Sequence, residues 1–219
     1  MPIFRPESVI LIAACLTATA AHIAAIRFEK PLVSGLAKAV ASTSFVAVAA
    51  INGASSSSYG RFILTALILS WVGDLLLLSR RSSFLLGGIA TFLIAHLAFA
   101  AAFTRETIDQ NWLIGAMVCT AVAGVLLIRW LWPRLERFYH IAVPAYVAAI
   151  MTMTSLAVGV SAASMPATVA VGAIMFAVSD VSVARDRFIE SSFVNKAWGL
   201  PLYYAAQLLL ASSVIAAGR

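Results

Sequence analysis

Hydrophobic residues fill the chain in eight long stretches that short polar segments separate. The stretches occupy residues 8–26, 31–51, 62–78, 84–103, 112–131, 141–160, 167–184 and 197–217. Each is close to the roughly 20 apolar residues that a helix needs to cross a hydrocarbon layer about 30 Å thick. The polar segments are too short to form a separate domain. The pattern therefore predicts an all-α polytopic membrane protein, a single bundle of about eight transmembrane helices over residues 1–219.

The composition supports the membrane class. Hydrophobic residues make up 62% of the chain and charged residues 11%, and the mean hydropathy is +0.98. A soluble domain needs a far more polar surface than this. Cys15 and Cys119 lie inside apolar stretches without CxxC or Cys/His spacing, so we expect both to be structural.

The first stretch has some features of a signal peptide, with Arg5 before it and Ala-x-Ala patterns near its end. Its apolar run is long, and Arg27 and Lys30 flank it. We therefore expect a retained helix.

The net charge of +6 is compatible with nucleic-acid binding, but the basic residues lie in the connections and not on one patch. We therefore expect no nucleic-acid partner and interpret the charge as membrane topology. Ten basic residues belong to the odd-numbered connections: Arg27, Lys30, Arg80, Arg81, Arg129, Arg134, Arg137, Arg185, Arg187 and Lys196. Four lie on the other side: Arg5, Arg61, Arg105 and Arg219. The positive-inside rule then places the odd-numbered connections in the cytoplasm and both termini outside, in the plasma membrane if the chain is bacterial.

Ionisable residues inside the spans are candidates for function, because each costs several kcal/mol in a bilayer unless it is paired or hydrated. These residues are His22, Lys38, Asp74, His96 and Asp180. All except His96 lie about 8 to 12 Å from the basic connections, at about 1.5 Å per residue. Tyr203 and Gln207 follow Lys196 by seven and eleven residues and share a helix face at i, i+4 spacing. We therefore expect a cavity that opens toward the cytoplasm.

A structural interpretation exists for each candidate. Asp74 and Asp180 are also placed to pair with nearby arginines at the interface, and Lys38 to extend its ammonium to the surface. The histidines are compatible with packing, and Tyr203 and Tyr204 with an interfacial aromatic belt.

Other kinds of site receive no support from the motifs. The chain has no HExxH, no clustered histidine pair and no Asp-rich motif, so we expect no metal and no other cofactor. It also has no GxSxG elbow and no Gly-rich phosphate loop, which gives a serine hydrolase no support.

A set of short motifs follows in order along nearly the whole chain. They are Lys30-Pro31-Leu32 with Lys38; Ser70-x-x-Gly73-Asp74-x-Leu76-Leu77; Phe84, Gly88, Phe92 and His96; Pro144, Tyr146 and Met151; Gly172-Ala173-x-x-Phe176-x-x-Ser179-Asp180 with Ala184 and Phe188; and Tyr203-Tyr204-Ala205-x-Gln207-x-Leu209. In this order and spacing the chain resembles the YhhN family of membrane proteins, whose eukaryotic relatives are the lysoplasmalogenases. It departs from the family pattern at Val181-Ser182-Val183, where a more Leu-rich stretch is expected.

The resemblance implies a membrane-embedded hydrolase that cleaves the vinyl ether bond of lysoplasmalogens, either alkenyl-glycerophosphoethanolamine or alkenyl-glycerophosphocholine. The products are a fatty aldehyde and the glycerophospho head group. The family's catalytic carboxylates correspond to Asp74 and Asp180, which would act as acid and base in an order that the sequence does not assign. We expect the remaining candidates to bind the ether lysophospholipid or position water: Lys38, His96, Tyr203, Tyr204 and Gln207.

Two other classes remain open. A small-molecule or proton-coupled transporter would use the same intramembrane Asp, Lys and His residues as relay groups. The sequence lacks a visible repeat and paired helix breaks, which disfavours this alternative. A scaffold or lipid-binding protein without turnover is the third class.

Overall fold

The structure is a computed structural model that describes residues 6–79 and 81–217. Within these ranges, eight helices are long and apolar enough to cross a membrane, which confirms the predicted fold class. They are α1 (Pro6–Arg27), α2 (Pro31–Ile51), α3 (Ser58–Leu76), α4 (Ser82–Phe103), α5 (Gln110–Leu131), α6 (Tyr139–Ala163), α7 (Ala167–Phe188) and α8 (Phe193–Ser212). Three short pieces accompany them: η1 (Ala54–Ser56), η2 (Trp132–Arg134) and α9 (Val214–Ala217).

Several helices begin before the apolar run, because a polar residue caps the first turn. Ser57 accepts a hydrogen bond from the Gly60 amide, so α3 begins at Ser58 and not at residue 62. Ser192 caps α8 in the same way. With α7 extending to Phe188 and α8 beginning at Phe193, the connection between them covers residues 189–192 and is shorter than the gap of 185–196 between the apolar runs.

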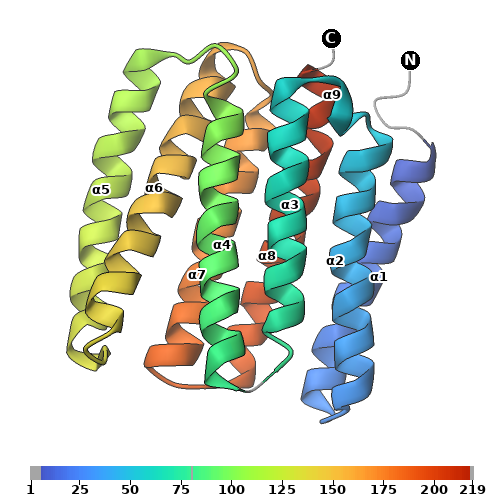
Figure 1. Cartoon of the computed structure of the whole chain (residues 1–219), viewed down its shortest axis with the longest axis vertical. Helices are drawn as coiled ribbons and strands as arrows, with labels where there is room; N and C mark the ends of the chain where they lie inside the picture. The colour runs from blue at the N-terminus through green and yellow to red at the C-terminus, as the bar shows by residue number, and fades with distance from the viewer. Residues whose placement is uncertain (1–5, 80, 218–219) are drawn as a thin grey trace.

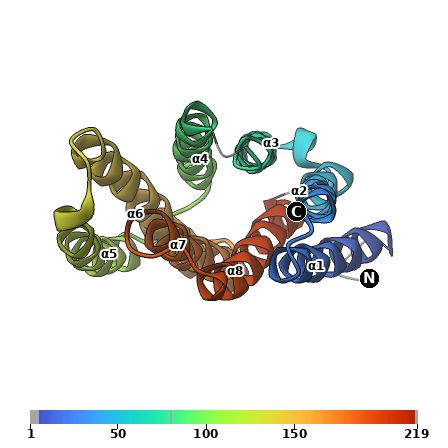
Figure 2. The same cartoon turned by 90° about the horizontal axis from the view of Figure 1, so that it is seen from below.

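The helices run up and down, and most sequence neighbours pack side by side; α4 is the exception, because it packs on α6 and not on α5 (Figure 1). Helix α8 lies against α7, α1, α2 and α3, whereas α5 packs mainly on α6 at the edge of the bundle (Figure 2). This arrangement makes α8 one of the two helices, with α4, that connect the first three helices to α6 and α7.

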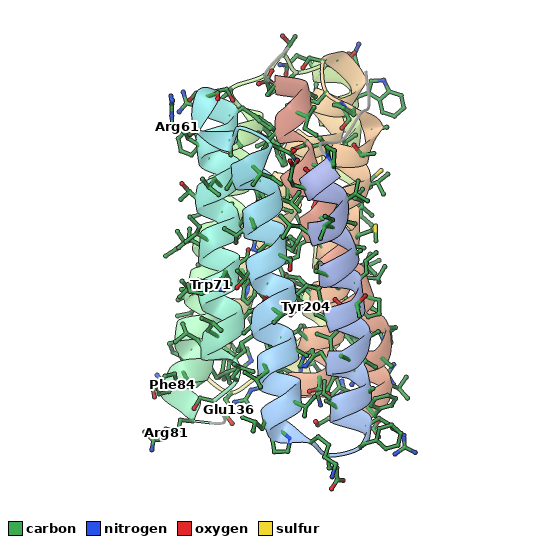
Figure 3. All side chains as sticks on the ribbon, turned by 90° about the vertical axis from the view of Figure 1, so that its right-hand side faces the viewer. Arg61, Trp71, Arg81, Phe84, Glu136 and Tyr204 are labelled. Carbon is green, nitrogen blue, oxygen red and sulfur yellow. The ribbon has the colours of Figure 1, made fainter. Side chains whose placement is uncertain are left out.

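The two ends of the bundle differ in charge. The turns after α1, α3, α5 and α7 lie at the end opposite the start of α1 and the end of α9 (Figure 1). Arg81 lies at the first of these ends and Arg61 at the other (Figure 3). Arg5, Arg80 and Arg219 fall outside the described residues. We call the end that carries the odd-numbered turns the basic end; that it faces the cytoplasm stays a prediction.

Glycines let α3 and α4 approach closely just where α3 reaches Asp74. A Cβ atom added to Gly73 would lie 2.7 Å from the Phe92 ring of α4, and one added to Gly88 would lie 2.7 Å from Leu77. The Phe92 ring packs in turn on Tyr203 of α8, with the ring centroids 5.9 Å apart. The Gly73 contact therefore sets the position of an aromatic ring in the interior.

We expect Gly73→Ala to lower the stability of the protein. The new methyl group would overpack the Phe92 contact, at a cost of about 1–3 kcal/mol. Gly115→Ala is the matched control, because a Cβ atom there meets nothing within 4 Å, and alanine favours the helix by up to about 1 kcal/mol. Thermal unfolding in detergent measures both variants. Equal melting temperatures would contradict the close approach of α3 and α4.

Candidate functional site

Asp74 is the centre of the first polar group inside the bundle. Its Oδ1 lies 3.2 Å from the Lys38 ammonium, and its side chain is 4% exposed. Its Oδ2 accepts hydrogen bonds from the Ser42 hydroxyl at 2.5 Å and the Tyr203 hydroxyl at 2.9 Å. Lys38 and Ser42 reach the same carboxylate because residues four apart share one face of α2. We call these four residues the Asp74 group.

Tyr204 and Gln207 border this group. The Tyr204 hydroxyl lies 3.4 Å from Ser42 Oγ, and the residue lies well away from both ends of the bundle (Figure 3). Gln207 is fully buried, and neither its amide nitrogen nor its oxygen has a hydrogen-bond partner among the described residues.

Asp180 of α7 is the centre of a second polar group. Its Oδ2 accepts a hydrogen bond from the Tyr146 hydroxyl of α6 at 2.8 Å. The same oxygen lies 3.5 Å from His96 Nε2 of α4, and the Asp180 side chain is 17% exposed. We call these three residues the Asp180 group.

The hydrogen bond on the other side of the imidazole fixes the His96 tautomer. His96 Nδ1 lies 2.6 Å from the Phe92 carbonyl oxygen. A carbonyl only accepts hydrogen bonds, so Nδ1 carries the proton, and a neutral ring then turns the lone pair of Nε2 toward Asp180. Nε2 and Asp180 Oδ2 are both acceptors, and they attract each other only when a proton lies between them. The arrangement is suited to holding one transferable proton.

The two carboxyl groups thus have different electrostatic surroundings. Asp74 faces a buried ammonium and accepts two hydroxyl donors, a setting that stabilises the charged carboxylate. Asp180 faces a phenol and an imidazole that is itself an acceptor when neutral. The first group thus pairs a carboxyl group with a cation, and the second places one beside neutral partners.

An aromatic cluster borders both groups. The fully buried Phe176 ring lies 4.6 Å from the His96 ring and 5.5 Å from the Tyr203 ring, measured between centroids. Phe92 packs on Phe176 and on Tyr203. A substrate that contacts both carboxyl groups would therefore lie along the Phe176 ring.

The predicted site residues divide between these surroundings. The structure brings Lys38, Tyr203 and Tyr204 toward Asp74, and it places His96 beside Asp180. Among the described residues no hydrogen bond or ion pair connects the two groups, whereas the sequence placed both carboxylates in one cavity. His22 lies outside both groups, with its Nδ1 3.0 Å from the Ser34 hydroxyl.

Two residues with direct contacts were missed as site residues. Tyr146 stands among the motif residues but was given no role, although its hydroxyl contacts Asp180. Ser42 follows Lys38 by four residues, and that spacing was the signal for it. In the part of the chain that the structure describes, no group of three His, Cys, Asp or Glu residues is arranged to hold a metal ion.

We expect Lys38→Met to destabilise the protein by about 3–5 kcal/mol, because it leaves the Asp74 charge buried without a partner. The double variant Lys38→Met with Asp74→Asn removes both charges and should recover most of the loss. Lys196→Met is the control: its ammonium lies 3.2 Å from Asp186, but its side chain is 37% exposed, and such pairs contribute at most about 1 kcal/mol. Thermal unfolding in detergent measures the stability of all three variants against the wild type. Additive effects of the two buried changes would argue against the pairing.

The comparisons with known proteins agree with this architecture. The sequence model of the YhhN family matches residues 33–214, most of the chain. A protein of Mycobacterium bovis named lysoplasmalogenase is 33% identical over 159 residues, which cover 68% of this chain and 59% of that protein. Lysoplasmalogenase TMEM86B of Rattus norvegicus is 32% identical over 74% of this chain and 65% of its own length. Lysoplasmalogenase TMEM86A of Bos taurus is 28% identical over 70% of this chain and 65% of its own length.

This chain therefore spans about six-tenths of the length of these relatives. No solved structure matches it.

Proposed function

Since the chain belongs to the YhhN family, we propose that it is a membrane hydrolase that cleaves the vinyl ether bond of lysoplasmalogens. The proposal takes the reaction from relatives that bear the name lysoplasmalogenase. The observation that carries it to this chain is the pair of interior aspartates, one beside an ammonium and two hydroxyl donors and one beside a phenol and an imidazole. The products would be a fatty aldehyde and a glycerophospho head group, of the ethanolamine or choline type.

The chemistry needs one proton donor and one group that handles water. A proton adds to the β-carbon of the vinyl ether, and the α-carbon and the ether oxygen then share the positive charge of an oxocarbenium ion. Water adds to the α-carbon and loses a proton, which gives a hemiacetal. The bond between the α-carbon and the glycerol oxygen of the hemiacetal then breaks. The hemiacetal hydroxyl becomes the aldehyde carbonyl, and the glycerol oxygen takes up the proton that this hydroxyl loses. One water molecule is consumed, and the proton is returned.

The surroundings of the two aspartates favour a division of these tasks. Asp180 would deliver the proton, because a protonated carboxyl group there would face the acceptor nitrogen Nε2 of His96 at 3.5 Å, and Tyr146 donates a hydrogen bond to the same carboxyl group. Asp74 would remain a carboxylate, stabilise the passing cation and orient water, because Lys38 balances its charge. The Phe176 and Tyr203 rings would line the space between them, where aromatic faces favour a cation.

The remaining predicted residues would hold the lipid. The Lys38 ammonium has three donors, so one contact with Asp74 leaves others for a phosphate or glycerol oxygen. Tyr204 and Gln207 would contribute neutral hydrogen bonds. The lysolipid would place its head group at the basic end and its hydrocarbon chain among the helices. With that end in the cytoplasm, substrate would enter from the cytoplasmic leaflet.

We expect Asp74→Asn and Asp180→Asn each to reduce aldehyde release by about 10²–10⁴-fold, the usual contribution of a positioned acid or base. Asp186→Asn is the control, because Asp186 belongs to a partly exposed network with Lys196 outside both groups. Purified protein in detergent, given an alkenyl lysophospholipid, provides the measurement. Full activity in either of the first two variants, with the fold intact, would refute the proposed mechanism.

The same assay separates the other classes. A hydrolase releases aldehyde in detergent, where no membrane gradient exists, whereas a transporter or a scaffold releases none. A lysophospholipid with an ordinary acyl ester serves as the second substrate, and it should not be cleaved.

In deuterated water, we expect the released aldehyde to carry one deuterium at carbon 2, the former β-carbon, on a single face. The reason is that a fixed protein acid adds its proton from one side only. Rapid reduction of the aldehyde prevents exchange before mass spectrometry and stereochemical assignment. Deuterium distributed over both faces would indicate a free enol and not protonation by Asp180.

A further inference from the structure

Two buried polar side chains near Asp74 have no partner. Ser70 of α3 and Gln207 of α8 are both fully buried. Ser70 Oγ, Gln207 Nε2 and Gln207 Oε1 make no hydrogen bond within the described residues. Buried polar atoms are almost always satisfied, because leaving them unpaired costs free energy. Three such atoms on two neighbouring helices indicate a ligand that pairs with them.

The positions of these side chains follow from two hydrogen bonds that join α3 to α8. The Tyr203 hydroxyl bonds to Asp74 nearer the basic end, and the Tyr59 and Ser213 hydroxyls lie 2.7 Å apart nearer the other end. Ser70 lies between Tyr59 and Asp74 along α3. Gln207 lies between Tyr203 and Ser213 along α8. The two unpaired side chains therefore belong to the stretch of α3 and α8 that these two hydrogen bonds enclose.

Ser70 and Gln207 both lie farther from the basic end than the Asp74 group does. Ser70 precedes Asp74 by one helical turn, and Gln207 follows Tyr203 by one turn on the antiparallel helix. One turn of four residues is about 6 Å. A single water or hydroxyl spans about that length when it bonds to a polar group on each side. A ligand held by Ser70 and Gln207 would thus lie within reach of the Asp74 carboxylate.

The chemistry of the three atoms selects a small neutral ligand. The Gln207 amide offers a donor and an acceptor, and the Ser70 hydroxyl offers both functions. Neither side chain is charged, so the set does not fit a phosphate or a metal ion. A buried water molecule makes two to four hydrogen bonds, which matches this set. An alcohol hydroxyl matches it as well.

We propose that Ser70 and Gln207 form a subsite that binds one hydroxyl-bearing ligand next to Asp74. Two sources supply this chemistry: the water molecule consumed in hydrolysis and the free hydroxyl on the glycerol of the lysolipid. The subsite deepens the proposed function and rests on it. It gives a binding role to Ser70, which has no role in the mechanism above, and it gives Gln207 a specific ligand.

The kinetic test uses Ser70→Ala and Gln207→Leu, which remove the hydrogen-bonding atoms of the two side chains. Each should lower kcat/KM for aldehyde release about tenfold, the size of one lost hydrogen bond. Each should leave the melting temperature unchanged or raise it, because an unpaired buried group is removed. Ser44→Ala is the matched control, since the Ser44 hydroxyl is buried but bonds to Val40 of its own helix; it should leave kcat/KM unchanged.

An analogue that lacks the glycerol hydroxyl separates the two sources. If the lipid hydroxyl is the ligand, Gln207→Leu and the wild type should cleave the analogue at equal rates. If water is the ligand, the tenfold difference should persist on the analogue. Wild-type kcat/KM in both variants on both substrates would overturn the subsite, even though the proposed function would stand.

A structural test does not depend on turnover. An experimental structure that orders water molecules, with and without an uncleavable saturated ether lysolipid, should show density within hydrogen-bond distance of Ser70 Oγ and Gln207. A direct bond between the two side chains, or a protein partner for each, would overturn the subsite. If that density is present but the wild type releases no aldehyde, the proposed function fails and the subsite remains.

Discussion

A carboxylate in the interior of a membrane protein must find its partners within the protein, because the hydrocarbon offers none. Asp74 finds them on two other helices: an ammonium and a hydroxyl on α2 and a phenol on α8. Separating any of these helices would strand a charge or a polar group in an apolar medium. The requirement for pairing therefore fixes how α2, α3 and α8 lie relative to one another, and the close glycine contact of α3 with α4 adds the fourth helix.

The same requirement is met differently at Asp180, and the proposed mechanism depends on that difference. No ammonium balances this carboxyl group among the described residues; its partners are the Tyr146 hydroxyl and an imidazole nitrogen. If the Asp180 carboxyl group is protonated, it is able to donate to the unprotonated Nε2 of a neutral His96. Two aspartates of one bundle thereby have different partners, and the proposed acid–base mechanism needs such a difference between its two carboxyl groups.

The sequence predicted the helices well and the contacts of the site only in part. Apolar runs of membrane length are a strong signal, and the run 31–51 matches α2 at both ends. Helix starts such as Ser58 depend on capping residues outside the run. Counting residues predicted a similar depth for Asp74 and Asp180, which stays a prediction, but it did not predict their division into two groups. This division depends on which way each helix turns about its axis, and the Phe92 and Phe176 rings, which pack on each other, border both groups.

Hydrolysis inside a bilayer has a difficulty that a soluble enzyme lacks, since water is scarce in the hydrocarbon layer where the lipid substrate is abundant. The hydrocarbon chain of the lipid partitions into the bundle readily, but water does not. A membrane hydrolase must therefore bind water at specific polar atoms near its carboxylate, and those atoms reduce stability whenever they are unpaired. Unpaired Ser70 and Gln207 atoms beside a fully paired Asp74 are what this constraint predicts. A fold selected for stability alone would place apolar side chains at both positions.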